Sequence, residues 1–550
     1  MREKILIAAK KLMLACLAIL AVVGLGMTRV SALSKDDKAE LKITNIQGGP
    51  TVTLYKIGEG VYNTNDDSFI KFKYVDGVKL TETGPTSKEI TTIANKIADK
   101  SISPKVADTQ HKVNDTYTYK STGAGVYIAV LTGTTDGRTF NPILLAASYN
   151  GEGKLVTTEV SSKSKYLYGQ TSVVKSSLPS IDKEVSGTTQ DNSKDTASLG
   201  QVVSYKLTVE LPSYATEAVN KTVYISDTMS EGLTFDFSSL TVEWNGKTAT
   251  VATDGSVKID NTKIATAKKV GNGFNLSFVY DALKEIAPKV SYKAVINEKA
   301  VVGEVGNTNT AEFFYSNNPT SGNTYEDVNK KPDEGNGITK KEKSKTVYTY
   351  QVAFKKVDEK QNGLANAIFG IYSDKDTTKL VDIVTTNSRG YAVSTQVGRG
   401  IYYIKELQAP AGYSLNTKVY NVTADWTSST TKTSVDSTNT TYTTDQSKAA
   451  NKSGQVGWLK DSIFYVLENK PGGDNIQAAY ISSSTTISEN TTIINKNEGA
   501  GTVLLNQDIP NTKLGELPST GSIGTYLFKA IGSAAMIGAI GIYIVKRRKA

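Results

Sequence analysis

The chain of 550 residues has a single cysteine, Cys16, and a single histidine, His111. Cys16 lies within an N-terminal apolar run that we expect to be removed, so the secreted product has no thiol for a disulfide or a thiolate metal site. His111 lies in a polar run (TQHKVNDT) without an obvious serine elbow or metal-ligand neighbours. A Ser-His-Asp site or a histidine zinc site is therefore disfavoured, and we expect neither a metal nor a cofactor.

The excess of positive charge is confined to the two ends of the chain. Of 63 basic and 54 acidic residues, residues 1–32 hold five basic and one acidic, and residues 521–550 hold five basic and no acidic, which leaves 53 of each. Binding to nucleic acid needs a basic patch on the folded part, so the balanced charge gives no support for it. We interpret the run KKEK at 340–343 as a solvated linker.

The N-terminus has the three parts of a secretory signal. Lys4, Lys10 and Lys11 precede the apolar run 12–27, and 30–32 (VSA) places small residues at the −3 and −1 positions of a cleavage site. We expect a signal peptide over 1–32 and a mature N-terminus near Leu33. A lipoprotein would carry its lipid on Cys16, but most of the apolar region follows that residue, so we reject this alternative.

The C-terminus also has three parts in a fixed order. A pentapeptide precedes an apolar stretch at 523–545 that is long enough to cross a bilayer, and the cations at 546–549 would hold that stretch at the cytoplasmic side. The pentapeptide is Leu517-Pro518-Ser519-Thr520-Gly521. This tail resembles the cell-wall sorting signal of Gram-positive surface proteins, in which a sortase cuts between Thr and Gly and joins the Thr carbonyl to an amine. The alternative is an ordinary tail-anchored protein.

The part of the chain between the two ends indicates about three all-β domains. About 485 residues remain after processing, too many for one core. Short alternating runs rich in Thr, Val, Ile and Tyr predict strands of Ig-like sandwiches, for example at 51–55, 126–130, 203–209, 223–225 and 311–315. The best helix is 87–100, with Ser87 as a possible cap and Glu89 in its first turn.

Two boundaries divide this central part. Pro179 interrupts any strand that would continue from 176–178, and the polar run 317–345 has no apolar periodicity and is interpreted as a linker. A Thr/Ser/Asn-rich insertion at 428–453 is expected to be an exposed loop. The resulting segments are 1–32, 33–177, 178–340, 341–516 and 517–550.

Strand parity places ionisable residues inside two of the sandwiches. Residues two apart share one face of a strand, so a charged residue in phase with apolar ones is predicted to be buried. In the middle domain this applies to Lys183, Asp227 and Asn309. In the last domain it applies to Lys356 and Glu406, and also to Asn511, which is expected to lie with Ile509 on the last apolar strand. No comparable trio occurs in the first domain.

A buried lysine and acid are unfavourable unless they are paired or neutral. Because burial lowers the pKa of the lysine and raises that of the acid, a neutral amine would lie beside a protonated acid and a carboxamide. Such a set can react: the amine attacks the Asn carbonyl, the acid shuttles protons and ammonia leaves. The alternative is a snorkelling lysine in an ordinary salt bridge.

A family resemblance supports the reactive interpretation. YYIKELQAPAGY at 402–413 resembles the E-box YxLxETxAPxGY of CnaB-type domains in sortase-assembled pilins, with Ile404 and Leu407 as mild departures. The matching residues are Tyr402, Glu406, Ala409, Pro410, Gly412 and Tyr413. PSIDKEV, ISDTMSEGLTF and GNTNTAEFFY resemble the pilin D2 domain, in which an Asp takes the role of the Glu. The resemblance covers essentially the whole chain and is weakest over 33–160.

The resemblance implies intramolecular isopeptide bonds from Lys183 to Asn309, with Asp227 as the catalytic acid, and from Lys356 to Asn511, with Glu406 in that role. Asn307, Asn506 and Lys355 remain competing assignments, of which strand parity is taken to disfavour Lys355 and Asn307. No such bond is expected in the first domain. The fold class that follows is all-β: tandem Ig-like and CnaB-type sandwiches in an elongated rod, with a cleaved signal peptide and a transmembrane sorting tail.

The same resemblance implies polymerisation. Pilins present a lysine in a motif ending YPKN at the close of their first domain, and Lys175 occupies that position, eight residues before Lys183, although Val174 and Ser176 depart from the motif. Lys163 and Lys165 are alternatives. We therefore expect an isopeptide bond between Lys175 of one subunit and Thr520 of the next.

The expected function is that of a structural major subunit of a cell-surface pilus that supports adhesion and is not an enzyme. The expected partners are a pilin-type sortase, a housekeeping sortase, other copies of the chain, peptidoglycan and ancillary pilins. A monomeric wall-anchored adhesin is the first alternative, and a surface enzyme is the second, although no catalytic-domain pattern supports it. The host ligand, the species and the sortase are not indicated by the sequence.

Overall fold

The computed structural model describes residues 34–67, 69–81, 85–149, 168–427, 430–432, 437–487, 493–496 and 499–515. The expected signal peptide, the LPSTG motif and the apolar stretch 523–545 lie outside these residues. The described residues form two compact units. The first contains those up to Gly187 together with Val203–Val295 and Asn307–Thr346, and the second contains Thr188–Val202, Ile296–Gly306 and those from Val347 onward.

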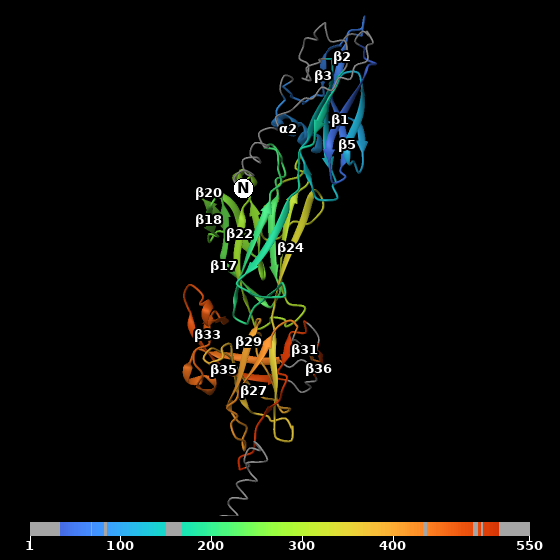
Figure 1. The fold of residues 1–550 in the computed structure, drawn as a ribbon. Coiled ribbons are helices and arrows are strands. Elements are labelled where there is room, and N and C mark those ends of the chain that lie inside the picture. Colours follow the sequence, from blue (N-terminus) through green and yellow to red (C-terminus); the bar gives the residue numbers. More distant parts are fainter. Residues whose placement is uncertain are drawn as a thin grey trace, which may run out of the picture. The chain divides into compact units, whose positions relative to one another are not determined.

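In the residues that the structure describes, the N-terminal part of the first unit has two larger sheets, one short strand pair and one helix (Figure 1). Its elements are β1 (Lys38–Ile46), β2 (Thr51–Tyr62), β3 (Phe69–Tyr74), α2 (Ser87–Ala98), β4 (Lys105–Gln110), β5 (Asp115–Thr122), β6 (Gly125–Thr132), β7 (Thr139–Phe140), β8 (Ile143–Ser148), β9 (Tyr168–Gly169), β10 (Thr171–Val173) and β11 (Ser176–Ser177). One sheet has the order β10–β1–β5, and the other has the order β3–β2–β6–β8–β9 with β4 beside β2. A short pair, β11–β7, lies at the end of this region.

Alternation along these strands produces two cores in this region. Leu41 and Ile43 of β1 pack with Val52 and Leu54 of β2 in the core between the sheets. Residues of opposite phase on the six-stranded sheet pack with α2 in a second core that includes Ile93. Both faces of the six-stranded sheet are therefore covered.

The remainder of the first unit is a sandwich of two sheets. Its elements are β12 (Ser180–Ser186), β15 (Val202–Glu210), β16 (Val223–Met229), β17 (Leu233–Trp244), β18 (Lys247–Thr250), β19 (Ser256–Ile259), β20 (Thr262–Lys269), β21 (Gly273–Phe278), α3 (Tyr280–Leu283), β22 (Lys289–Ile296), β23 (Asn307–Ser316) and β24 (Ile338–Tyr348). One sheet has the order β12–β15–β22–β17–β18, and the facing sheet runs β24–β23–β16–β21–β20–β19. Phe235 of β17 meets Phe274 of β21 across the interior, with ring centroids 5.5 Å apart.

The second unit contains another two-sheet sandwich. Its elements are β13 (Thr189–Asp191), β14 (Lys194–Thr196), β25 (Gln351–Val357), β26 (Ile368–Tyr372), β27 (Leu380–Thr385), β28 (Tyr391–Val393), β29 (Gly400–Gln408), β30 (Val419–Ala424), β31 (Thr430–Lys432), β32 (Ser437–Thr443), η1 (Gln446–Lys448), η2 (Ala450–Lys452), β33 (Gly457–Lys460), β34 (Ile463–Val466), η3 (Leu467–Asn469), β35 (Gln477–Ile487), β36 (Ile493–Lys496), β37 (Thr502–Leu504) and β38 (Ile509–Pro510). One sheet has the order β28–β25–β37–β31–β36, with β38 also parallel to β25. The other runs β30–β29–β26–β27–β35–β33–β34, with β32 beside β35.

The all-β prediction and the five strand examples are confirmed, since each predicted run lies within β2, β6, β15, β16 or β23. The predicted helix cap is wrong by one residue. α2 begins at Ser87, and its N-cap is Thr86, whose hydroxyl accepts a hydrogen bond from Glu89 N while the Glu89 carboxylate accepts one from Thr86 N. Among the described residues, none of the helices is long and apolar enough to cross a membrane.

The interpretation of 317–345 as a linker is wrong for its last part. Residues 338–345 belong to β24, where Thr310 and Ser344 share a hydroxyl hydrogen bond of 2.8 Å and Lys340 forms an ion pair with Glu312 at 3.4 Å. The solvated-linker interpretation of 340–343 fails for the same reason. The sequence pattern did not indicate this strand, because most of its side chains are polar and show no apolar alternation. Its pairing with β23 defines it as a strand.

The expected exposed loop at 428–453 is also partly wrong. β32 runs antiparallel to β35, with Thr443 opposite Tyr480. The Tyr442 ring stacks on Phe464, with centroids 4.1 Å apart. Thr-rich composition suits a strand as well as a loop, and only pairing with a distant segment separates the two.

Candidate functional site

Lys183, Asp227 and Asn309 converge inside the middle sandwich, as strand parity predicts. Lys183 lies on β12, whereas Asp227 and Asn309 lie on the neighbouring strands β16 and β23 of the facing sheet, where Asn309 is opposite Met229. Each of the three is at most 2% exposed. Lys183 Nζ donates a hydrogen bond to Asp227 Oδ2 at 2.7 Å. The sequence-predicted trio is therefore brought together.

A tyrosine that sequence reasoning missed completes this site. The Tyr292 hydroxyl donates to Asp227 Oδ2 at 2.5 Å and accepts from Asn309 Nδ2 at 3.2 Å. Tyr292 is in phase with Val290 and Ala294 on β22, so alternation indicated that its ring is buried. Nothing in the sequence indicated which buried tyrosine meets the acid, because that depends on the packing of two sheets.

The electrostatics of the middle site favour uncharged partners. Burial lowers the pKa of the Lys183 amine to about 8, although the Asp227 carboxylate acts in the opposite direction. Burial also raises the pKa of Asp227, and the neighbouring Lys183, Tyr292 and Asn309 offset only part of this effect. Asp227 Oδ1 and Asn309 Oδ1 are buried without a hydrogen-bond partner among the described residues. A neutral amine beside a protonated acid and a carboxamide is the set that acyl transfer requires.

Lys356, Glu406 and Asn511 form the second site, in the last sandwich. Lys356 Nζ donates to Asn511 Oδ1, Asn511 Nδ2 donates to Glu406 Oε1 at 2.9 Å, and Lys356 Nζ lies 3.5 Å from the same Glu406 oxygen. Each of the three residues is at most 3% exposed. Burial lowers the pKa of the Lys356 amine to about 8 against the opposing effect of Glu406. A larger fraction of this amine is therefore neutral than of an ordinary lysine amine, and it contacts the Asn511 carbonyl group that it would attack.

Local backbone contacts position this second trio. β38 runs parallel to β25, so Lys356 is opposite Ile509, and Asn511 N donates to Val357 O at 3.0 Å. The other Glu406 oxygen, Oε2, accepts from Asn416 N at 2.6 Å, a contact that sequence reasoning missed. This backbone hydrogen bond fixes the carboxylate with one oxygen free for Asn511 and Lys356.

The rest of the E-box forms a turn that holds the C-terminal segment. Tyr413 N donates to Pro410 O, and Gly412 has φ +86°, a left-handed conformation that glycine adopts without strain. Leu514 N then donates to Gly412 O at 2.9 Å. Tyr402 at the start of the motif is buried, and its hydroxyl donates to Gly398 O. Ala409 lies half-buried just before the turn. The motif therefore supplies the acid and also anchors the chain directly after Asn511.

The competing assignments separate once the structure is known. Asn506 is exposed, and Lys355 is half-buried with its amine 5.7 Å from the Tyr391 ring, so neither reaches the trio of the last domain. The parity argument against Asn307 was wrong, because Asn307 and Asn309 are two residues apart on β23 and both are buried. Contact distinguishes them: the Asn309 amide bonds to Tyr292, which bonds to Asp227.

Lys175 lies between β10 and β11 with an exposed side chain, and backbone hydrogen bonds hold the chain at Lys175 and at the preceding residue. Its carbonyl accepts from Asn141 N at 3.2 Å, and the preceding Val174 is buried and donates from its N to Thr44 O. Lys163, Lys165 and the residues 517–521 lie outside the described residues. His111 is exposed, with Nδ1 3.1 Å from Thr51 Oγ1.

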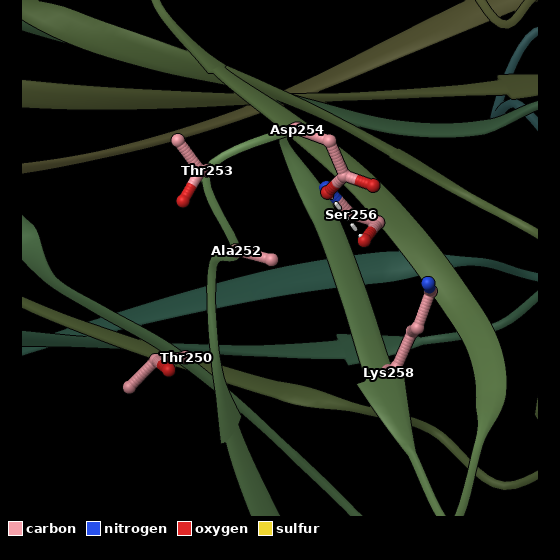
Figure 2. A pocket seen from close by; sticks show the side chains of 6 residues that line it. All are labelled: Thr250, Ala252, Thr253, Asp254, Ser256 and Lys258. Carbon is pink, nitrogen blue, oxygen red and sulfur yellow. Dashed lines mark hydrogen bonds between the residues drawn. The ribbon is translucent and has the colours of Figure 1, made fainter.

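A surface hollow of about 370 Å³ lies at the β19 hairpin (Figure 2). The Asp254 carboxylate beside it is occupied within the turn, where it accepts from Ser256 N at 2.8 Å and from Ser256 Oγ at 2.6 Å. The lining residues are Thr250, Ala252, Thr253, Asp254, Ser256 and Lys258. They include no member of either trio, so the hollow has no part in the chemistry described above.

Sandwich domains that each bury a lysine, an acid and an asparagine define a class of Gram-positive surface subunits. Four known families match successive parts of the chain. The matches are a T6 antigen Ig-like domain (residues 36–176), a Gram-positive pilin backbone subunit 2 Cna-B-like domain (199–319), a prealbumin-like fold domain (350–441) and an LPXTG cell wall anchor motif (509–550).

Individual related proteins match nearly the whole chain, whereas each domain family matches one part of it. The trypsin-resistant surface T6 protein of Streptococcus pyogenes serotype M6 is 69% identical over 539 residues, which cover 98% of this chain and all of that protein. The solved structure of the T6 backbone pilin of the same serotype has a TM-score of 0.81 and 62% identity, and the match covers 88% of this chain and all of that one. This chain therefore belongs to the T6-type backbone pilins, and it is a structural subunit of an extracellular pilus anchored to the cell wall.

Proposed function

We propose that the chain polymerises head to tail into a covalent fibre, through an isopeptide bond between Lys175 of one subunit and Thr520 of the next. Such a contact joins two different surfaces, so it does not close on itself and the fibre propagates. A pilin-type sortase would form the bond, and a housekeeping sortase would join the completed fibre to peptidoglycan. Ancillary pilins and support of adhesion belong to the same proposal.

The environment of Lys175 supports this assignment. A lysine that attacks an acyl-enzyme must be accessible to a second protein, and Lys175 is exposed. Its backbone is held by the hydrogen bonds at Val174 and Asn141, so the amine projects from a fixed point. Fixing the nucleophile reduces the entropy that is lost when the two subunits and the sortase come together.

The two buried trios carry the second part of the proposal, in which each domain forms an internal isopeptide bond. Lys183 would bond to Asn309 with Asp227 as the acid, and Lys356 to Asn511 with Glu406 as the acid. In each case the amine nitrogen bonds to the Asn side-chain carbon, and the Asn nitrogen leaves as ammonia. The reaction occurs once per chain during folding, so the trios are not the active site of an enzyme that turns over.

We propose three domains, at 33–177, 178–340 and 341–516. The ranges matched by the three domain families support this division. The T6 backbone pilin structure is described as modular and three-domain, which also supports it. β24 runs from 338 to 348, so the proposed second boundary lies within a strand.

Intact mass of the recombinant ectodomain tests the internal bonds. The wild-type protein should be lighter than its sequence by the mass of two ammonia molecules. Asp227→Ala and Glu406→Ala should each restore one of them, and the double variant should restore both. A wild-type mass equal to the sum of its residues would overturn the internal bonds.

Wall extracts of cells that express the chain test the fibre. The wild type should give a ladder of high-mass species that resists SDS, and Lys175→Arg should reduce it to monomer. Lys105→Arg, at an exposed position in the same domain, is the matched control and should keep the ladder. A ladder that persists with Lys175→Arg would exclude Lys175, after which Lys163 and Lys165 would be replaced in turn. A single band from the wild type would indicate the monomeric adhesin.

A further inference from the structure

The Tyr292 hydroxyl occupies a position in the middle site that has no counterpart among the hydrogen bonds that the described residues form at the last site. It lies between the acid and the amide nitrogen, and it donates to Asp227 Oδ2 at 2.5 Å while it accepts from Asn309 Nδ2 at 3.2 Å. In the described part of the last domain, the amide nitrogen of Asn511 instead donates directly to Glu406 Oε1 at 2.9 Å. The hydroxyl thus links Asp227 to the Asn309 amide nitrogen, whereas Glu406 contacts the Asn511 amide nitrogen directly.

The Tyr292 ring is held rigidly in this position. It stacks on Tyr205 with centroids 5.5 Å apart and meets the edge of Phe274 at 5.0 Å and of Phe235 at 5.8 Å. Burial, together with the neighbouring Asp227, keeps the pKa of the hydroxyl well above its usual value, so the group stays protonated. A fixed hydroxyl that contacts both Asp227 and Asn309 can relay a proton between them, because it gives up its own proton as it receives another.

The atom that Tyr292 contacts is the leaving group of the proposed bond-forming reaction. When the amine of Lys183 attacks the Asn309 side-chain carbon, the bond from that carbon to Nδ2 must break. Nδ2 is a poor leaving group unless it receives a proton as the bond breaks. The Tyr292 hydroxyl, which accepts a hydrogen bond from Nδ2, is close enough to supply that proton.

We propose that Tyr292 is a catalytic residue that passes a proton to Asn309 Nδ2, an inference that rests on the proposed bond between Lys183 and Asn309. Protonated Asp227 gives its proton to the Asn309 carbonyl oxygen as the Lys183 nitrogen bonds to the carbon, and the resulting Asp227 carboxylate takes a proton from that nitrogen. Tyr292 donates its own proton to Nδ2 and takes the proton held by Asp227. As ammonia leaves, the proton on the former carbonyl oxygen returns to Asp227, so the isopeptide bond remains and both Asp227 and Tyr292 return to their initial states.

Tyr292→Phe tests the proposal, because it removes one oxygen and keeps the ring. The middle bond should form at least about 100-fold more slowly, the lower range for the loss of a positioned acid. The bond of the last domain should form at the wild-type rate in the same chain. The measurement is a time course of intact mass after synthesis, with peptide mapping to assign the missing ammonia to Asn309 or Asn511.

Tyr205→Phe is the matched control, because it removes a hydroxyl from the neighbouring ring and leaves the bonds among Asn309, Tyr292 and Asp227 in place. It should form the middle bond at the wild-type rate. A second variant combines Tyr292→Phe with Asp227→Glu, whose added methylene fills the vacated space and brings the acid to Asn309 directly, as in the last domain. This double variant should recover the middle bond, which a merely structural role of the hydroxyl would not produce.

The outcomes separate the two proposals. A wild-type chain without the mass loss at Lys183 and Asn309 would refute the internal bond itself. A wild-type chain with the bond, together with Tyr292→Phe that forms it equally fast, would refute the role of Tyr292. If Tyr292→Phe alone fails to fold, seen as trypsin cleavage within the middle domain, the double variant decides: recovery of the bond supports the proposal, and a folded domain that remains unbonded overturns it.

Discussion

The middle and last sandwiches assemble the same three functional groups from different sheets. In the middle domain, Lys183 lies on one sheet and Asn309 on the facing one. In the last domain, Lys356 and Asn511 belong to β25 and the segment after its parallel neighbour β38, and Glu406 comes from the opposite sheet. The proposed reaction would therefore require a dry interior and a short distance between the groups, and it would not require one particular strand arrangement.

The two arrangements would have different mechanical consequences. A bond from Lys183 to Asn309 would join two facing sheets, whereas a bond from Lys356 to Asn511 would join segments that already share one sheet. The first would resist separation of the sandwich, and the second would resist peeling of the C-terminal strand. Asn511 also comes shortly before Leu517 in the sequence, so the second bond would carry tension that enters the domain from the sorting signal.

The largest expected effect comes from removing each acid while its size is kept. Asp227→Asn and Glu406→Gln should each lower the free energy of unfolding of their own domain by about 5 kcal/mol, the value expected for cross-linking a loop of more than 100 residues. The loop in the last domain spans 155 residues. Thermal unfolding midpoints should fall by roughly 10–20 °C. An unbonded variant that unfolds at the wild-type temperature would contradict this expectation.

Hydrogen exchange on the same two variants sharpens the comparison. Asp227→Asn should increase exchange in both sheets of the middle domain, because the link between them is lost. Glu406→Gln should increase exchange mainly at 509–515, because only the terminal strand loses its tether. Mass spectrometry of each variant confirms beforehand that the bond is absent. Equal, domain-wide increases in both variants would show that the difference in sheet placement has no mechanical consequence.

A smaller effect is expected from Glu406→Asp. The shorter acid should lose its direct contact with Asn511 Nδ2, and the hydrogen bonds of the last site in the described structure include no tyrosine hydroxyl to replace it. The bond of the last domain should therefore form about 10-fold or more slowly, since general acid–base catalysis depends on reach. The bond of the middle domain in the same chain is the control. An unchanged rate would show that an aspartate suffices without a bridging hydroxyl.

The smallest expected difference concerns pH, because the two sites should respond alike. Burial lowers the pKa of both lysines to about 8, so below that pH each amine is mostly protonated and cannot attack. In the slow variants Tyr292→Phe and Glu406→Asp, the rate of bond formation should rise about tenfold per pH unit up to about pH 8. Burial raises the pKa of the Asp227 carboxyl, so this acid keeps its proton to a higher pH than an ordinary carboxyl group does. A rate that does not change below pH 8 would contradict the requirement for a neutral amine.

Local sequence pattern determined much of this architecture. Alternation predicted that Lys183, Asp227 and Lys356 point into sandwich cores, and the burial of each side chain confirms it. The E-box pattern singled out Glu406 as the candidate acid of the last domain. These features could be predicted because a strand has a period of two, so a residue's face follows from its immediate neighbours.

Tertiary structure decided which buried groups meet. Parity could not separate Asn307 from Asn309 or select Tyr292 among the chain's 29 tyrosines, because each choice depends on how two distant strands are registered. β24 and β32 were missed for the same reason, since polar strands are defined by their partners and not by apolar alternation. The sequence by itself thus determined which side chains are buried, because the face of a strand on which a residue lies follows from its neighbours in the sequence. The packing of the sheets determined which buried side chains touch, because contact depends on strands that are distant in the sequence.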